Sequence, residues 1–184
     1  MNKAIAIGTS AGGIDALDFL LPHVPATSSV ALFVVQHISA DSDSYFIRML
    51  NKKCKRKVKE ACHTEEINPN IIYFAPPGYH LIIEEDFTLT LSVDEKINFS
   101  RPSIDLMFET AAEAYRKNLT GIILTGANSD GSIGLKTIKD MGGTTIVQNP
   151  KKAKFPDMPT AALQLHSPDM ILTLEEIARY LERI

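Results

Sequence analysis

The chain has 184 residues, 45% of them hydrophobic and 22% charged, and its formal net charge is −3. This size and composition are typical of one globular domain, and the slightly acidic balance gives no general support for nucleic-acid binding. The two cysteines, Cys54 and Cys62, form no disulfide framework, which favours a reducing cytoplasm, and no run of ~20 apolar residues would cross a bilayer.

Four apolar runs, at residues 4–8, 30–36, 121–125 and 144–148, predict β-strands. They lack strict alternation, as is typical of parallel strands that are covered on both faces.

Helical patterns separate and follow these strands. They span residues 13–21, 43–54, 103–117, 132–141 and 174–184. Asp41 or Ser42, Ser103 and Thr173 are the candidate N-caps of the second, third and last helices. Strands that alternate with helices predict βαβ units, so we expect an α/β fold, a three-layer α/β/α sandwich with a doubly wound, mostly parallel sheet.

The middle of the chain departs from this alternation. The runs at residues 71–74, 80–84 and 87–92 are short, and the last two alternate around Glu85-Asp86 as a hairpin does. We expect an antiparallel hairpin at one edge of the sheet, and a single domain over residues 1–184.

Three chemically useful side chains follow predicted strands. Ser10 follows the first strand in the turn TSAGG, His37 follows the second, and Asp130 lies in the turn after the 121–125 strand. Ligands bind at the carboxyl ends of the strands in an open α/β sheet, so we expect these three side chains at one edge. A serine, a base and an orienting carboxylate are the groups that acyl transfer needs.

The turn around Ser10 fits the pattern G-x-S-x-G, in which small residues allow a tight strand-to-helix bend that exposes the serine. It fits neither G-x-G-x-x-G nor a P-loop. Each residue alone has another interpretation: small residues pack in the first turn of many α/β proteins, His37 is structural, and Asp130 caps a helix. Their expected convergence favours catalysis.

Six blocks occur in order along the chain: IGTSAGG, VVQH, APPGYH, RPSID, LTGANSDG and FPDMP. Together they resemble the catalytic domain of CheB-type chemotaxis protein-glutamate methylesterases, over nearly the whole chain. By position, the resemblance implies that Ser10 is the nucleophile, His37 the general base and Asp130 the orienting carboxylate.

Two departures from the family's usual sequence lie near this predicted site. Ala11 stands where the family usually has threonine, and LTGANSDG stands where it typically reads LTGMGNDG, so Ala127 occupies a position that the family uses beside the oxyanion. A backbone N–H survives a side-chain change, so we expect the N–H groups near Ala11 and Ala127 to hold the oxyanion.

Other residues have a structural and a functional interpretation. Arg101 precedes a proline-led helix start capped by Ser103; alternatively, Arg101 lies near the cleft and receives an acidic substrate helix. Met158 matches a family loop near the active site and is expected to form part of its wall. His80 is expected to be a surface histidine, with the cleft rim as the alternative. The basic run at residues 52–57 is expected to be a solvated helix end, or else to steer acidic receptor helices toward the protein.

The resemblance implies a serine hydrolase that demethylates glutamate γ-methyl esters on methyl-accepting chemoreceptors, releases methanol, and also deamidates receptor glutamine. It implies no cofactor or metal and no membrane insertion. Expected partners are the receptors, with a separate receiver domain or a chemotaxis kinase as further candidates. The family commonly carries an N-terminal receiver domain, and we expect none in this chain because it begins at the first predicted strand.

Two alternatives remain open from the sequence. One is a receptor- or nucleotide-binding module with an inactive triad, and the other is an esterase for a small ester unrelated to chemotaxis. An acidic residue at the end of the second strand would favour nucleotide binding, but Gln36-His37 stands there.

Overall fold

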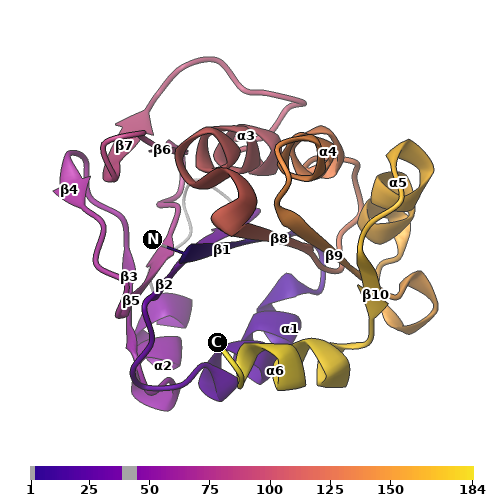
Figure 1. Cartoon of the computed structure of the whole chain (residues 1–184), viewed down its shortest axis with the longest axis horizontal. Helices are drawn as coiled ribbons and strands as arrows, with labels where there is room; N and C mark the ends of the chain where they lie inside the picture. Colours follow the sequence, from indigo (N-terminus) through magenta and orange to yellow (C-terminus); the bar gives the residue numbers. More distant parts are fainter. Residues whose placement is uncertain (1–2, 39–44) are drawn as a thin grey trace.

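A computed structural model describes residues 3–38 and 45–184 of the chain (Figure 1). Its main sheet has seven strands in the order β10-β9-β8-β1-β2-β5-β3, and all neighbouring pairs are parallel. The strands are β1 (Lys3–Thr9), β2 (Val30–Gln36), β3 (Lys57–Glu60), β5 (Ile71–Phe74), β8 (Leu119–Ile123), β9 (Thr144–Gln148) and β10 (Met170–Leu172).

Helices cover both faces of this sheet (Figure 1). One face carries α3 (Ile104–Tyr115), α4 (Ser132–Asp140) and α5 (Asp157–Leu165), and the other carries α1 (Gly13–Leu20), α2 (Tyr45–Lys53) and α6 (Leu174–Leu181). Successive residues of a strand point to opposite faces, so β1 contributes Ala4 and Ala6 to the first core and Ile5 and Ile7 to the second. The expected three-layer α/β fold is confirmed.

The hairpin lies elsewhere than expected. Strands β6 (His80–Ile83) and β7 (Thr88–Ser92) pair with β4 (Glu65–Glu66) in a separate three-stranded antiparallel sheet. The main sheet has no place for them at β5, because β5 pairs on both sides, with β2 and β3. The hairpin packs instead over α3, where the Ile83 N–H donates to Thr110 Oγ1 at 3.2 Å.

Helix caps follow the sequence where the structure describes them. Ser103 caps α3 by accepting from the Leu106 N–H, and Thr173 forms a capping box with Glu176 at α6. The candidate caps Asp41 and Ser42 lie outside the described residues.

The basic run is not uniformly solvated. Arg56 is only 3% exposed, and its guanidinium donates to the carbonyl oxygens of Pro25, Val30 and Pro69. The expectation of a solvated helix end is therefore wrong for this residue, because its buried guanidinium makes three hydrogen bonds to backbone carbonyl oxygens. No helix in the described part of the chain is long and apolar enough to span a membrane.

Candidate active site

The turn after β1 holds Ser10 through its backbone. The Ser10 N–H donates to the Thr125 carbonyl at 3.0 Å, and the Ser10 carbonyl accepts from Gln36 Nε2 and the Gly13 N–H, both at 2.9 Å. Gly12 has a φ of 77°, a left-handed backbone conformation that residues other than glycine rarely adopt. Neighbouring turns and one glycine thus fix where the half-buried serine leaves the sheet.

His37 and Asp130 meet across this turn. His37 follows β2 and Asp130 lies in the segment after β8, and β1 runs between these two strands. His37 Nε2 lies 2.8 Å from Asp130 Oδ2, and the His37 N–H donates to the Thr9 carbonyl at the end of β1. The pair therefore joins the two turns that flank the turn of Ser10.

The N-terminus of α3 encloses the Asp130 carboxylate. The Ile104 N–H donates to its Oδ2 at 2.7 Å, while the Asp105 N–H and Ser103 Oγ donate to its Oδ1 at 3.1 Å. Burial opposes ionisation, but the hydrogen bonds from His37, Ile104 and Asp105 outweigh it and lower the pKa of Asp130. Asp130 is thus an ionised carboxylate at the positive end of a helix, fully committed as an acceptor.

Glycine at position 8 of β1 allows this arrangement. A Cβ there would lie 2.3 Å from Ile104 Cγ2, so a larger residue would push the start of α3 off the sheet. The close approach brings the first N–H groups of α3 to Asp130. The alternative interpretation of Asp130, as the cap of the following helix, is not seen, because Gly131 holds the N-cap position of α4.

His80 supports the hydrogen-bond network around Asp130 through Ser103. Its side chain is completely buried, Nδ1 accepts from the Ser103 N–H at 3.2 Å, and Nε2 lies 3.0 Å from the Glu95 carbonyl. The expectation of a surface histidine is therefore wrong, because His80 fixes the residue that caps α3 and donates to Asp130. The sequence signals at this place were the candidate N-cap Ser103 and the blocks APPGYH and RPSID, which contain His80 and Ser103.

A second buried carboxylate lies beside the first. Asp105 is 4% exposed and accepts from the Gly134 N–H at 2.8 Å. Burial, together with the neighbouring charge of Asp130, raises the pKa of Asp105 to about 6. The pKa of Asp130 is thus lowered and that of Asp105 raised, although Asp130 accepts from the first N–H groups of α3 and Asp105 lies on that helix.

The second ring nitrogen of His37 also has a neighbour. Asn128 Nδ2 lies 3.2 Å from His37 Nδ1, and Asn128 Oδ1 accepts from the Asp130 N–H at 3.1 Å. The Ser10 hydroxyl makes no hydrogen bond with any of the described residues. The structure therefore pairs His37 with Asp130 and brings their turns beside that of Ser10, but the part of the chain that it describes offers the serine hydroxyl no hydrogen-bond partner.

The expected oxyanion donors differ in their surroundings. Ala11 is half-buried in the turn before α1, whereas Ala127 is exposed in the turn after β8. Within residues 3–38 and 45–184, neither backbone N–H donates to a protein acceptor. Both groups are free to donate to a ligand oxygen, and Ala11 adds the positive end of α1.

Arg101 and Met158 also lie near this edge. Arg101 lines a cavity of about 430 Å³ with His37 and Lys96, while its Nη1 donates to the Val93 and Asp94 carbonyls at 2.6 and 2.8 Å. Arg101 thus lines a cavity that His37 also lines, and its hydrogen bonds show that it holds a loop.

Met158 lies under the turn that follows β8. It is completely buried, its N–H donates to the Gly126 carbonyl, and a Cβ at Gly126 would lie 2.6 Å from its Cε. Met158 therefore supports the turn of Asp130 from beneath, and its place in the wall of the active site stays a prediction.

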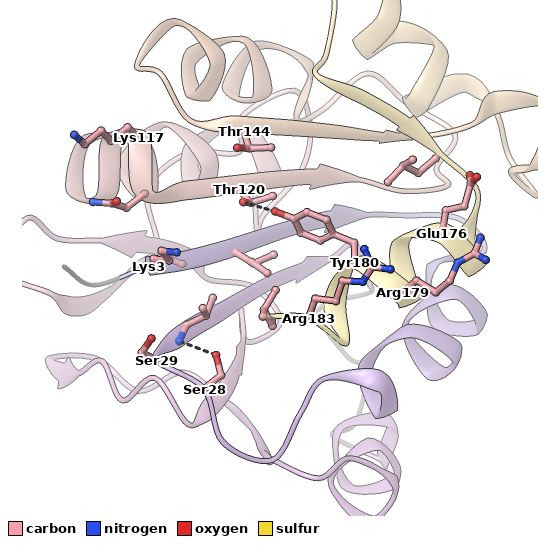
Figure 2. A pocket seen from close by; sticks show the side chains of 16 residues that line it. Lys3, Ser28, Ser29, Lys117, Thr120, Thr144, Glu176, Arg179, Tyr180 and Arg183 are labelled. Carbon is pink, nitrogen blue, oxygen red and sulfur yellow. Dashed lines mark hydrogen bonds between the residues drawn. The ribbon is translucent and has the colours of Figure 1, made fainter.

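A larger groove occupies the opposite edge of the sheet. It has a volume of about 820 Å³ and is lined by residues at the amino ends of the strands, among them Lys3, Thr120 and Thr144 (Figure 2). Tyr180 on α6 lies at one side of the groove, and its hydroxyl oxygen is 3.2 Å from Thr120 Oγ1. None of the sequence-predicted site residues lines this groove, so volume alone does not mark the edge that carries the candidate site.

Comparisons with known proteins agree with this fold. Residues 5–181 match the CheB methylesterase family. The chain is similar to the crystal structure of the Thermotoga maritima CheB methylesterase catalytic domain, with a TM-score of 0.94 and 30% identity, over 100% of this chain and 98% of that one.

Curated relatives point the same way. A Leptospira interrogans protein, provisionally named protein-glutamate methylesterase/protein-glutamine glutaminase, is 50% identical over 182 residues, 99% of this chain and 94% of that protein. A Syntrophus aciditrophicus protein of the same name, numbered 2, is 35% identical over 100% of this chain but only 54% of its own length.

The fold defines a protein of the doubly wound α/β class, and the names of its relatives are those of ester hydrolases. Within that class, the chain belongs to the CheB methylesterase family. The expected resemblance and the expected enzyme class are confirmed at this level.

Proposed function

We propose that this protein is a serine hydrolase that cleaves glutamate γ-methyl esters on methyl-accepting chemoreceptors, with Ser10, His37 and Asp130 as its triad. The observation that carries the proposal is the 2.8 Å contact between His37 Nε2 and Asp130 Oδ2, made between the turns on either side of Ser10. A carboxylate that only accepts hydrogen bonds fixes the imidazole proton on Nε2 and leaves Nδ1 as the base.

In the acylation half of the reaction, Ser10 Oγ attacks the ester carbonyl carbon while His37 Nδ1 takes the hydroxyl proton. The carbonyl oxygen becomes an oxyanion, held by the backbone N–H groups of Ala11 and Ala127. When the tetrahedral intermediate collapses, His37 returns the proton to the leaving oxygen and methanol departs. Asp130 stabilises the imidazolium in between, because it remains ionised at the start of α3.

Deacylation repeats these steps with water as the nucleophile. His37 takes a proton from water, the hydroxide attacks the glutamyl ester of Ser10, and the serine leaves with the proton from His37. The product is a glutamate carboxylate. A glutamine side chain enters the same route with ammonia as the leaving group, which accounts for the glutaminase activity in the names of the relatives.

The substrate assignment rests on the family and on the charge near His37. Lys96 and Arg101 line the same cavity as His37, and both side chains are cationic, which suits a receptor helix that carries several glutamates. We further propose that residues 1–184 act as one catalytic domain in the cytoplasm, with receptors as partners and a receiver domain or chemotaxis kinase as regulator.

Mass spectrometry of a receptor-helix peptide carrying glutamate γ-methyl esters tests this function. The protein should convert the esters to glutamates and release an equal amount of methanol, while an identical peptide with free glutamates stays unchanged. Hydrolysis of a small neutral ester without any action on the peptide would identify a different esterase. Binding of the peptide without conversion would identify an inactive binding module.

A further inference from the structure

The Asn128 side chain lies against His37 Nδ1, the ring nitrogen that the proposed reaction needs as its base. Its Nδ2 lies 3.2 Å from His37 Nδ1, while His37 Nε2 is engaged with Asp130. The His37 side chain is only 13% exposed, and both of its nitrogens have protein neighbours. With Asn128 in place, a proton from Ser10 has no free ring nitrogen to go to.

The orientation of the Asn128 amide follows from its second hydrogen bond. The Asp130 N–H can only donate, so the atom of Asn128 that faces it at 3.1 Å is the oxygen. The NH₂ group then points at His37. Because that group can only donate, His37 Nδ1 is its acceptor and carries a lone pair, in agreement with a proton on Nε2 facing Asp130.

We propose that Asn128 is a positioning residue that covers the His37 Nδ1 lone pair in the resting enzyme and moves away when substrate binds. This inference rests on the proposed function, since it takes His37 Nδ1 to be the base. Asn128 is exposed in the turn between β8 and α4, so its side chain can rotate into solvent without disturbing the core. The contact would keep the Nδ1 lone pair occupied and the serine unactivated until a ligand enters.

The charges around the His37 ring favour an amide over a carboxylate at position 128. Asp130 faces Nε2, with Asp105 beside it, and Lys96 and Arg101 line the cavity that His37 also lines. A carboxylate at position 128 could still accept from the Asp130 N–H. Its other oxygen can only accept, so it would form a hydrogen bond with His37 only when Nδ1 carries a proton. The ring would then be held as an imidazolium between two carboxylates, and the base would be lost.

Two substitutions therefore act in opposite directions. Asn128→Ala removes the cover, so kcat/KM on a small neutral ester should rise about fivefold through a lower KM with kcat unchanged, since one exposed hydrogen bond no longer has to break. Asn128→Asp should lower kcat/KM by at least about tenfold. Ser129→Ala, a change at the adjacent exposed residue, is the matched control and should leave both constants unchanged.

Nuclear magnetic resonance separates this inference from the proposed function. In wild-type protein with labelled histidine, the ¹⁵N signals of His37 should show a protonated Nε2 and a hydrogen-bonded Nδ1 lone pair. Asn128→Ala should move the Nδ1 signal toward that of a free lone pair, whether or not the protein hydrolyses any ester.

Two results would overturn the inference. One is an Nδ1 signal that is the same in wild type and Asn128→Ala. The other is a hundredfold fall of kcat in Asn128→Ala, which would make the amide an oxyanion donor.

Discussion

Replacement of Asp130 by asparagine tests how the start of α3 and the catalytic edge depend on one carboxylate. Four donors converge on this group: His37 Nε2 and the Ile104 N–H on Oδ2, and Ser103 Oγ and the Asp105 N–H on Oδ1. An amide has one accepting oxygen and one NH₂ group, so it cannot satisfy all four.

The magnitude follows from the two possible orientations of the amide. If its oxygen stays with His37 and Ile104, its NH₂ meets the Asp105 N–H, and one buried donor is orphaned. If the amide turns, the NH₂ meets Ile104 and forces the wrong tautomer on His37. An orphaned buried group costs about 1–3 kcal/mol, and weakening of charge-assisted bonds adds to it, so we expect about 3 kcal/mol of lost stability.

The loss of activity should be larger than the loss of stability suggests. Without an ionised carboxylate, the imidazolium that forms during acylation has no stabilising partner, or the proton sits on the wrong nitrogen. We expect kcat/KM to fall about 10³- to 10⁴-fold. Steady-state methanol release measures this change, and circular dichroism of the same sample shows whether the variant is folded.

Urea unfolding at several pH values adds the sign of the electrostatic contribution. The pKa of Asp130 is lowered in the folded protein, so its stabilisation is present above the unfolded pKa near 4 and is lost as pH falls through the folded value. The stability difference between wild type and Asp130→Asn should therefore be largest near neutral pH and shrink below about pH 4. A difference that is independent of pH, or activity within about tenfold of wild type, would refute this account of the site.

Three further changes test the surroundings. Asp105→Asn should stabilise the protein by up to about 3 kcal/mol near pH 8, because the folded pKa of about 6 means that ionisation above it costs stability; urea unfolding should show no gain below about pH 4. Ser103→Ala should cost about 1 kcal/mol as a lost cap and also lower kcat, whereas Thr173→Ala should cost a similar amount of stability with kcat unchanged. Arg101→Ala should weaken turnover of an acidic receptor peptide more than that of a small neutral ester, and an equal loss on both would make Arg101 purely structural.

The boundaries of several strands were predictable from the sequence, because parallel strands that are buried on both faces are short runs of apolar residues. The bounds of β2 and β9 match the predicted ones. The predicted strand at residues 121–125 is shifted by two from β8, because the apolar Leu124 and the β-branched Thr125 are buried beyond the end of the strand. The polar edge strand β3 and the helix α5, which contains Pro159, lack the patterns that mark buried elements.

The support of the candidate site was less accessible to sequence reasoning. His80 and Ser103 lie 23 positions apart, and Asn128 and His37 lie 91 apart, so only the folded chain brings each pair together. Residue type also misled, because a lone histidine after a turn is ordinarily exposed. The three proposed triad residues could be selected without any knowledge of contacts. The rule that ligands bind at the carboxyl ends of parallel strands was enough, because each of the three follows a predicted strand.

The central claim is that Ser10 is the nucleophile, and methanol release by Ser10→Ala from a methylated receptor-helix peptide tests it most directly. Ser29→Ala, an exposed serine that lines the groove at the opposite edge of the sheet, is the matched control. The account predicts that Ser10→Ala loses about 10⁴-fold or more in kcat with an unchanged free energy of unfolding, while Ser29→Ala keeps wild-type activity. Activity of Ser10→Ala within about tenfold of wild type would contradict the account.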